Sequence, residues 1–130
     1  MMVMDTDVCV EILRGNLKVL RKQNTYPGEL KVSFMTGAEL FFGAEFSARP
    51  LESHALLKRF LAAVPILPFE EAILRRFGAV KASLKRKKML IPDADIFIAA
   101  TALERGEGLV TGNSRHFARI DGLHIEDWTR

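Results

Sequence analysis

The stretch from Ile91 to Leu103 constrains the fold of this chain more than any other part of the sequence. It opens with Ile91-Pro92-Asp93 and continues as a run of Ala, Ile and Leu that would be apolar on nearly every side of a helix. Proline is tolerated in or just before the first helical turn, and an aspartate at this point can cap it. A helix that is apolar all round must be buried. The sequence therefore predicts a core helix whose charged residues gather at its leading end.

Asp95 lies a residue or two inside this predicted helix, among core neighbours. The free backbone N–H groups and the dipole at a helix N-terminus favour the ionised form of such a carboxylate. An ionised, half-buried carboxylate needs a partner. The helix terminus itself is one candidate partner, and a cation or a phosphate-bearing substrate is the other. Asp95 alone does not decide between them.

The 130 residues, 48% of them hydrophobic, match one domain that buries about two-thirds of its unfolded surface. We expect a single domain over residues 1–130. Cys9 is the only cysteine, which excludes an internal disulfide or a thiolate zinc site and fits a reducing cytoplasm. The sequence has no basic leader followed by an apolar segment, and no apolar run near the roughly 18 residues of a membrane span. We therefore expect a soluble, unprocessed cytoplasmic protein.

The basic residues are unevenly distributed. The formal charge is only +3, yet the pI is about 9.2 and Lys85-Arg86-Lys87-Lys88 stand directly before the predicted core helix. Such a run is usually a solvated helix end, but beside a cluster of acids it would also guide a polyanion into a metal site. The two interpretations are compatible.

Short apolar segments alternate with helical patterns along the chain. The predicted strands cover residues 1–4, 30–34, 66–67 and 109–111, with an edge strand between 120 and 128; the longer predicted helices cover 35–46, 51–64, 70–87 and the stretch after Pro92. Parallel strands need crossover connections, and these are nearly always helical. We expect an α/β fold: a three-layer α/β/α sandwich with a short-stranded, mainly parallel central sheet.

Four segments bring polar residues to the expected ends of strands or starts of helices. They supply Asp5, Glu39, Asp95 with Asp93, and Asn113. Two carboxylates about 4 Å apart repel by roughly 4 kcal/mol at an effective dielectric of 20, so a cluster of acids calls for a cation. Oxygen ligands without His or Cys suit Mg²⁺ or Mn²⁺ rather than zinc. Glu39 also has a structural explanation, because Thr36-Gly37-Ala38-Glu39 matches a helix capping box.

Four blocks of the sequence carry a family resemblance: Met4–Val8, Thr36–Ala44, Asp95–Leu103 and Leu109–Phe117. They resemble the four acidic blocks of PIN-domain ribonucleases, and most closely those of the VapC toxins of type II toxin–antitoxin systems. The tail from Ile120 to Trp128 resembles the usual ending of that group, so the similarity covers essentially the whole chain in the right order.

The resemblance implies a single PIN-like domain acting as a metal-dependent endoribonuclease. Asp5, Glu39 and Asp95 match the catalytic, metal-binding acids, and Asn113 matches the fourth catalytic position. Many members carry Asp at that fourth position, so Asn113 supplies no charge there. Asp93 is interpreted first as a helix cap and second as an auxiliary ligand. The implied cofactor is Mg²⁺ or Mn²⁺, and the implied reaction is in-line attack of a metal-activated water on a phosphodiester.

The resemblance also implies partners. The substrate would be structured RNA, such as transfer or ribosomal RNA; a VapB-like antitoxin would bind the active-site groove; and a homodimer would form. We expect phosphate contacts from five basic residues, and contacts to water or phosphate from two hydroxyls. The basic residues are Arg14, Lys85, Arg86, Lys87 and Arg115, and the hydroxyls are Thr6 and Ser114. Ser114 also has the position of a cap for a short helix. His54, His116 and His124 are scattered, and none is assigned a catalytic role.

Two other functions are compatible with parts of the sequence. Asp5-Thr6-Asp7-Val8 after an apolar strand resembles the opening of haloacid-dehalogenase-type phosphatases, although that interpretation accounts for two acidic blocks instead of four. Phosphate release from a generic monoester would favour it. A non-catalytic module that binds nucleic acid or protein would explain the acids as helix caps, and metal-independent RNA binding without cleavage would favour that alternative.

Overall fold

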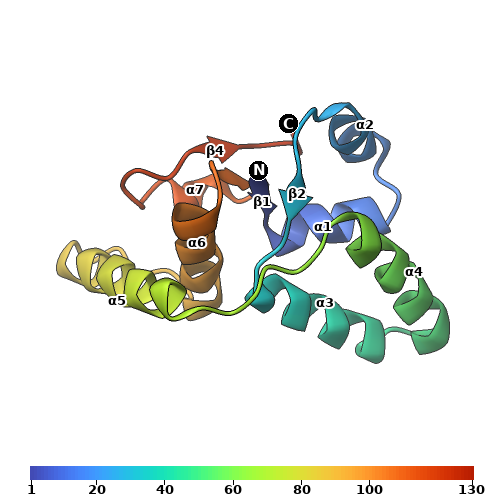
Figure 1. The fold of residues 1–130 in the computed structure, drawn as a ribbon, viewed down its shortest axis with the longest axis horizontal. Helices are drawn as coiled ribbons and strands as arrows, with labels where there is room; N and C mark the ends of the chain where they lie inside the picture. Colours follow the sequence, from blue (N-terminus) through green and yellow to red (C-terminus); the bar gives the residue numbers. More distant parts are fainter.

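The computed structural model describes residues 1–130 as a small parallel sheet surrounded by helices (Figure 1). All strand pairs in the sheet are parallel, in the order β2-β1-β3-β4. The strands are β1 (Met2–Met4), β2 (Leu30–Lys31), β3 (Leu109–Val110) and β4 (Ile125–Glu126). The helices are α1 (Thr6–Leu13), α2 (Leu17–Thr25), α3 (Phe34–Phe46), α4 (Pro50–Ala63), α5 (Glu71–Arg86), α6 (Asp93–Arg105) and α7 (Ser114–Phe117). The predicted fold class is confirmed.

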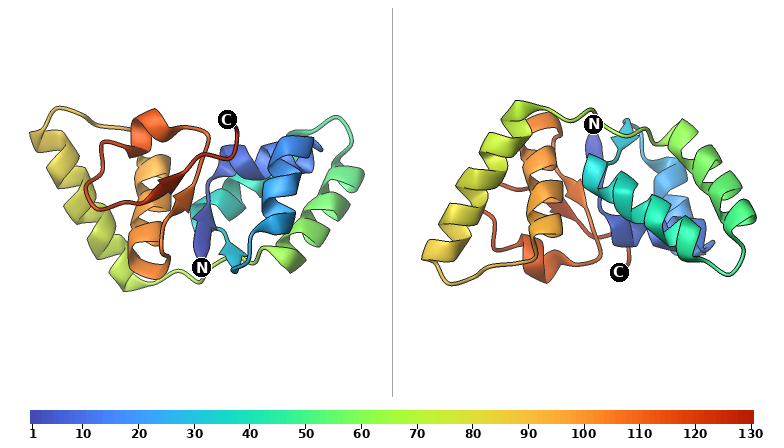
Figure 2. Two further views of the ribbon diagram at one scale, coloured as in Figure 1. Left: turned by 90° about the horizontal axis from the view of Figure 1, so that it is seen from above. Right: turned by 90° about the horizontal axis from the view of Figure 1, so that it is seen from below.

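The alternation of side chains along the strands produces two hydrophobic cores, one on each face of the sheet. Met2, Met4 and Val110 point toward α1 to α4, whereas Val3 and Leu109 point toward α5, α6 and α7. The two helical layers lie on opposite sides of the sheet in both views of Figure 2. Both faces of the sheet are covered, which explains why its strands are apolar throughout.

Helix α6 is the buried helix that the sequence predicts. Ile96, Ile98 and the residues from Ala99 to Ala102 are at most 1% exposed. Its outer side packs on α5, where the rings of Phe77 and Phe97 stack with centroids 4.0 Å apart. No helix is both long and apolar enough to cross a membrane.

The predicted elements differ from the observed ones mainly at their ends. The strand expected over 30–34 stops at Lys31 because Ser33 is already the N-cap of α3, with its Oγ accepting the Thr36 N–H at 3.1 Å. The strand expected over 66–67 is reduced to a single parallel bridge between Val32 and Ile66. Trp128 is 3% exposed and packs into the core, as expected for the tail.

Candidate active site

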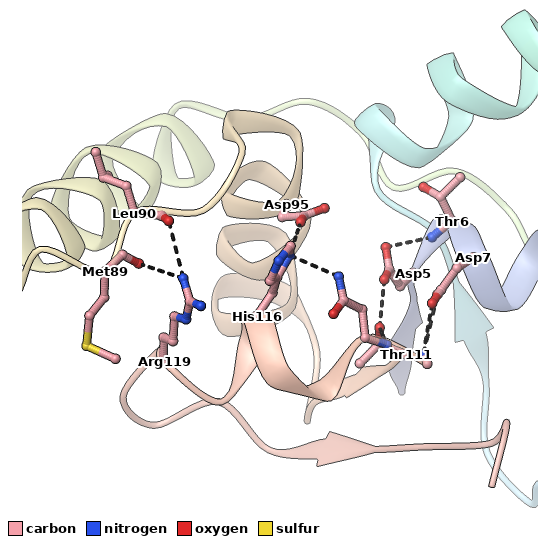
Figure 3. A network of polar contacts seen from close by, with 11 residues as sticks. Asp5, Thr6, Asp7, Met89, Leu90, Asp95, Thr111, His116 and Arg119 are labelled. Atoms are coloured by element: carbon pink, nitrogen blue, oxygen red, sulfur yellow. Dashed lines mark hydrogen bonds and ion pairs between the residues drawn. The ribbon is translucent and has the colours of Figure 1, made fainter.

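The carboxyl ends of β1 and β3 place Asp5 beside Thr111. Met4 pairs with Val110, and the Asp5 N–H donates to the Val110 carbonyl at 2.8 Å, so the next side chains in each strand meet. The Thr111 hydroxyl donates to Asp5 Oδ2 at 2.7 Å, and the Thr6 N–H donates to Asp5 Oδ1 at 2.7 Å (Figure 3). Asp5 is thereby the N-cap of α1. The sequence correctly located this acid at the rim of the sheet.

The environment of Asp5 is unfavourable for a bare negative charge. Its side chain is 5% exposed, and burial, followed by the negative charge of Asp7, raises the pKa of the Asp5 carboxyl to about 8. The hydrogen bond from Thr111 offsets only part of this effect. No lysine or arginine forms an ion pair with Asp5, Glu39 or Asp95. The site therefore lacks a protein cation that would neutralise these acids.

Glu39 contacts Thr6 at the start of α1 and does not cap its own helix. The Thr6 hydroxyl donates to Glu39 Oε1 at 2.7 Å and lies 3.0 Å from the buried hydroxyl of Thr36. The capping-box explanation of Glu39 is therefore wrong, since Ser33 caps α3 three residues earlier than the box requires. Thr6 therefore links Glu39 to the Asp5 carboxylate, because its hydroxyl binds Glu39 and its backbone N–H binds Asp5 Oδ1.

Asp95 is linked to the same site from the other side. Its Oδ2 lies 3.1 Å from Nδ1 of His116, which in turn lies 2.9 Å from the side-chain nitrogen of Asn113. The backbone N–H of Asn113 donates to the Thr111 hydroxyl at 2.9 Å. One continuous series of polar contacts therefore runs from Glu39 through Asp5 to Asp95, and we call it the acidic network. Its members are Glu39, Thr6, Asp5, Thr111, Asn113, His116 and Asp95.

Neither Asp93 nor Ser114 forms the helix cap that the sequence predicts. Asp93 is the first residue of α6 and forms no capping hydrogen bond; its side chain is 58% exposed and forms an ion pair with Lys81 at 2.9 Å. Ser114 is likewise the first residue of α7, where the N-cap position belongs to Asn113 and no side-chain cap bond forms. Asp93 is therefore paired with a lysine of α5, unlike Asp5, Glu39 and Asp95.

The basic residues predicted to contact RNA fall into two groups. Lys85, Arg86 and Lys87 are exposed where α5 ends, and this turn lies along the same edge of the molecule as the start of α6 and as α7, which carries Arg115 (Figure 2). Lys87 forms an ion pair with Asp121 at 2.8 Å. Arg14 lies on the other side of the site, in a groove of about 450 Å³ between α1, α3 and α4 that Glu39 also lines.

The donor set fits a hard divalent cation, although the acids do not form a closed coordination sphere. No group of three or more Asp, Glu, His or Cys side chains lies close enough to surround an ion. Magnesium ordinarily keeps several water ligands and uses only one or two protein carboxylates, with substrate phosphates completing its shell. The buried Asp5 carboxyl, without a cationic partner and with a raised pKa, is the feature that favours such an ion here.

Sequence reasoning missed two members of the acidic network, Thr111 and His116. Both had a signal. Thr111 is the first residue after β3, at the same end of the sheet as Asp5. His116 stands three residues after Asn113, a spacing that puts two side chains on the same side of one helical turn.

The sequence profile of the PIN domain matches residues 2–123. The chain is 36% identical over 127 residues to "Ribonuclease VapC2" of Haemophilus influenzae, which covers 97% of this chain and 96% of that protein. It is 31% identical over 128 residues to "tRNA(fMet)-specific endonuclease VapC" of Shigella flexneri, with 98% and 97% covered. Both similarities extend over nearly the full length of each protein.

The fold is similar to that of solved structures as well. A crystal structure of DNA-bound VapBC from Salmonella typhimurium superposes on this chain with a TM-score of 0.92 at 30% sequence identity. The match covers 98% of this chain and 99% of that one. The four strands and seven helices described above therefore form a known architecture.

Proposed function

The chain belongs to the PIN-domain family, and from this premise we propose how its acidic network works. It is an endoribonuclease of the VapC type. PIN-domain ribonucleases depend on divalent metal ions. For this chain we propose that Mg²⁺ or Mn²⁺ is the cofactor and that structured RNA, such as transfer or ribosomal RNA, is the substrate.

One observation carries the proposal for the site. Glu39, Asp5 and Asp95 come from three separate segments of the chain, yet hydrogen bonds join them into the acidic network without a lysine or arginine among its members. Ordinary surface acids are solvated or paired, as Asp93 is with Lys81. Keeping Asp5 buried and unpaired costs free energy, and a bound cation would recover that cost.

Asp5 and Asp95 are the residues that would hold the ion, with Glu39 as a further acid beside them. A bound divalent cation lowers the pKa of water and neutralises charge that develops on phosphoryl oxygens. The Thr111 hydroxyl and the Thr6 N–H hold the two oxygens of Asp5 in fixed directions. Thr6 also orients Glu39, so these two threonines position two of the acids. The proposed hydrolysis forms no covalent intermediate with the protein.

Asn113 occupies the fourth catalytic position without adding a charge. Its backbone N–H binds Thr111 and its side chain contacts His116, so it joins the Asp5 half of the network to the Asp95 half. We assign Asn113 to orienting water or phosphate. Ser114 follows it at the start of α7, half-buried, and offers a hydroxyl to the same end of the site.

Electrostatics supports the assignment of RNA-binding residues. Lys85, Arg86 and Arg115 are exposed and form no ion pair, so their charges are free for phosphates. Lys87 shares its charge with Asp121, and Arg14 lies 3.8 Å from Glu11. Phosphate contacts give affinity and orientation, whereas sequence choice in RNA comes from unpaired bases. We therefore assign these residues to substrate positioning.

The toxin–antitoxin context supplies the protein partner. We propose that the chain is the toxin of a type II pair and that a VapB-like antitoxin binds in the groove between α1, α3 and α4. The groove is lined by apolar side chains such as Leu40 and Leu57 and also by Glu39, so a segment lying in it would contact the acidic network. We also propose a homodimer, for which Phe42 and Phe46, 68% and 81% exposed, provide apolar surface on α3.

The decisive experiment is cleavage of total RNA with and without Mg²⁺ or Mn²⁺, with mapping of the cut sites. We expect metal-dependent cleavage by the unaltered protein and none by Asp5→Asn or Asp95→Asn, because each change removes a charged ligand. Both variants should keep the circular dichroism spectrum of the fold. Full activity in both purified variants would show that the site is assigned wrongly.

The same assay separates the alternatives. Release of inorganic phosphate from a generic monoester, with RNA left intact, would indicate the phosphatase. Metal-independent RNA binding without cleavage would indicate a non-catalytic module.

A further inference from the structure

The acidic network contains one imidazole, and its position is not explained by packing. His116 is 34% exposed in its side chain and its Nδ1 contacts Asp95 Oδ2 and the Asn113 amide at once. A residue that only filled space at this point would not need a polar atom aimed between two site residues. His116 therefore requires a functional account, which rests here on the function proposed above.

The chemistry of the three groups fixes where the proton lies. A carboxylate can only accept a hydrogen bond, so Nδ1 of His116 must carry the proton that binds Asp95. The structure places the side-chain nitrogen of Asn113 2.9 Å from this Nδ1. A protonated Nδ1 can bond only an acceptor, so the amide is turned to present its oxygen; the nitrogen and oxygen ends of an amide have the same shape. A single N–H thus sets the direction of both side chains.

Contacts on either side of His116 connect α7 to the core and to the segment before α6. Phe117, the next residue, is fully buried, and the Arg119 guanidinium donates to the carbonyls of Met89 and Leu90 at 3.5 and 3.3 Å (Figure 3). These bonds tie the turn after α7 to the segment that leads into α6, the helix that carries Asp95. The distance between the two helix starts is held by contacts that do not involve the acids.

We propose that His116 is a positioning residue that donates a hydrogen bond through Nδ1 to Asp95 and so holds this carboxylate in the orientation that binds the divalent cation. Without it, the Asp95 side chain would be free to rotate about its χ angles on the half-exposed first turn of α6. Groups that hold a metal-binding carboxylate typically change metal affinity by 10- to 100-fold when they are removed. His116 itself does not touch the ion or the RNA.

Four proteins test the proposal by Mn²⁺ binding, measured by electron paramagnetic resonance and by calorimetry without RNA. In His116→Leu, which keeps the bulk but loses the donor, we expect Mn²⁺ affinity to fall by about 10- to 100-fold. In His116→Asn, whose amide nitrogen takes the place of Nδ1, affinity should return to within about 3-fold of the unaltered protein. In His116→Gln, whose amide nitrogen takes the place of Nε2, it should stay low. Melting temperatures in EDTA report whether each variant folds.

Each outcome has a definite meaning. Equal Mn²⁺ affinity in the unaltered protein and in folded His116→Leu would overturn the positioning role, and so would equal rescue by Asn and Gln. Should His116→Leu fail to fold, the comparison of folded His116→Asn with folded His116→Gln decides the question alone. No Mn²⁺ binding by the unaltered protein would instead contradict the proposed function.

Discussion

The Asp5 carboxyl lies between a threonine hydroxyl and a helix N-terminus, and its ionisation is disfavoured first by burial and then by the charge of Asp7. A pKa raised from 3.8 to about 8 means that the folded protein holds a proton that the unfolded chain has already released. The sign of the pH effect follows from this difference. Below pH 4 both states are protonated; above it, stability falls as pH rises, until the folded carboxyl also ionises near pH 8.

We therefore predict that the metal-free protein loses stability between pH 5 and pH 7.5. The contribution from Asp5 falls by at most about 1.4 kcal/mol per pH unit. Asp5→Asn should flatten this dependence, because asparagine keeps the N-cap of α1 and carries no charge. Urea unfolding in EDTA at several pH values measures how the free energy of unfolding depends on pH in the two proteins. The same slope in both proteins would mean that Asp5 is ionised throughout.

Individual residues also show which parts of the site could be predicted from the sequence and which could not. Asp5 and Asp95 were predictable, since one follows an apolar strand and the other starts an apolar helix. The spacing of His116 from Asn113 was visible in the sequence, but its contact with Asp95, 21 residues away, is encoded by no local pattern. The ion pair of Asp93 likewise depends on Lys81 in the preceding helix, and no local pattern predicts it.

At the scale of elements, the start of α3 decides where Glu39 points. Ser33 and Thr36 are both possible N-caps there, and only Thr36 has the glutamate three residues later that a capping box requires. The structure uses Ser33, because Thr36 is buried against Thr6. The helix therefore begins earlier than its apolar pattern suggests, and Glu39 is released from capping to join the acidic network.

Removing the cap should destabilise the protein measurably. We predict that Ser33→Ala lowers the free energy of unfolding by about 1 kcal/mol, since its Oγ is fully buried and binds the Thr36 N–H. Ser114→Ala is the matched control: this serine forms no capping bond, so its loss should change stability by less than about 0.5 kcal/mol. Thermal or urea unfolding measures the stability of the two variants against the unaltered protein. Equal losses would restore Ser114 as a cap.

At the scale of the whole molecule, the two helical layers and the parallel sheet were predictable because short apolar strands alternated with helices. The placement of the acids together was predictable only in outline, since the carboxyl ends of neighbouring parallel strands share one edge. What that edge lacks is positive charge among its acids, and a divalent ion would supply it.

Metal binding should therefore be visible as global stabilisation. At a free-ion concentration 100 times Kd, a ligand of the folded state alone adds about 2.7 kcal/mol. For a chain of this size that corresponds to a rise in melting temperature of roughly 10 °C. We predict this rise for Mn²⁺ or Mg²⁺ with the unaltered protein, and little or none with Asp5→Asn. Calorimetry of EDTA-treated protein measures it; an unchanged melting temperature in the unaltered protein would argue against a metal site.

The basic end of α5 should govern RNA affinity through charge alone. Lys85 and Arg86 are exposed and unpaired, and they lie along the edge that carries the start of α6 and α7, whereas Arg21 and Lys22 form an equally exposed pair on α2, on the opposite side of the molecule (Figure 1). We predict that alanine at both Lys85 and Arg86 weakens RNA binding and lowers the slope of log K against log salt by about 0.7 for each phosphate that the variant no longer binds.

The double alanine variant of Arg21 and Lys22 is the control, because it removes the same two charges from the chain without altering the basic turn. All proteins should carry Asp5→Asn so that the RNA is bound and not cut. The salt titration then separates local contact from net charge. If both double variants reduce the slope equally, the overall charge of the protein attracts RNA and the end of α5 has no special part in binding it.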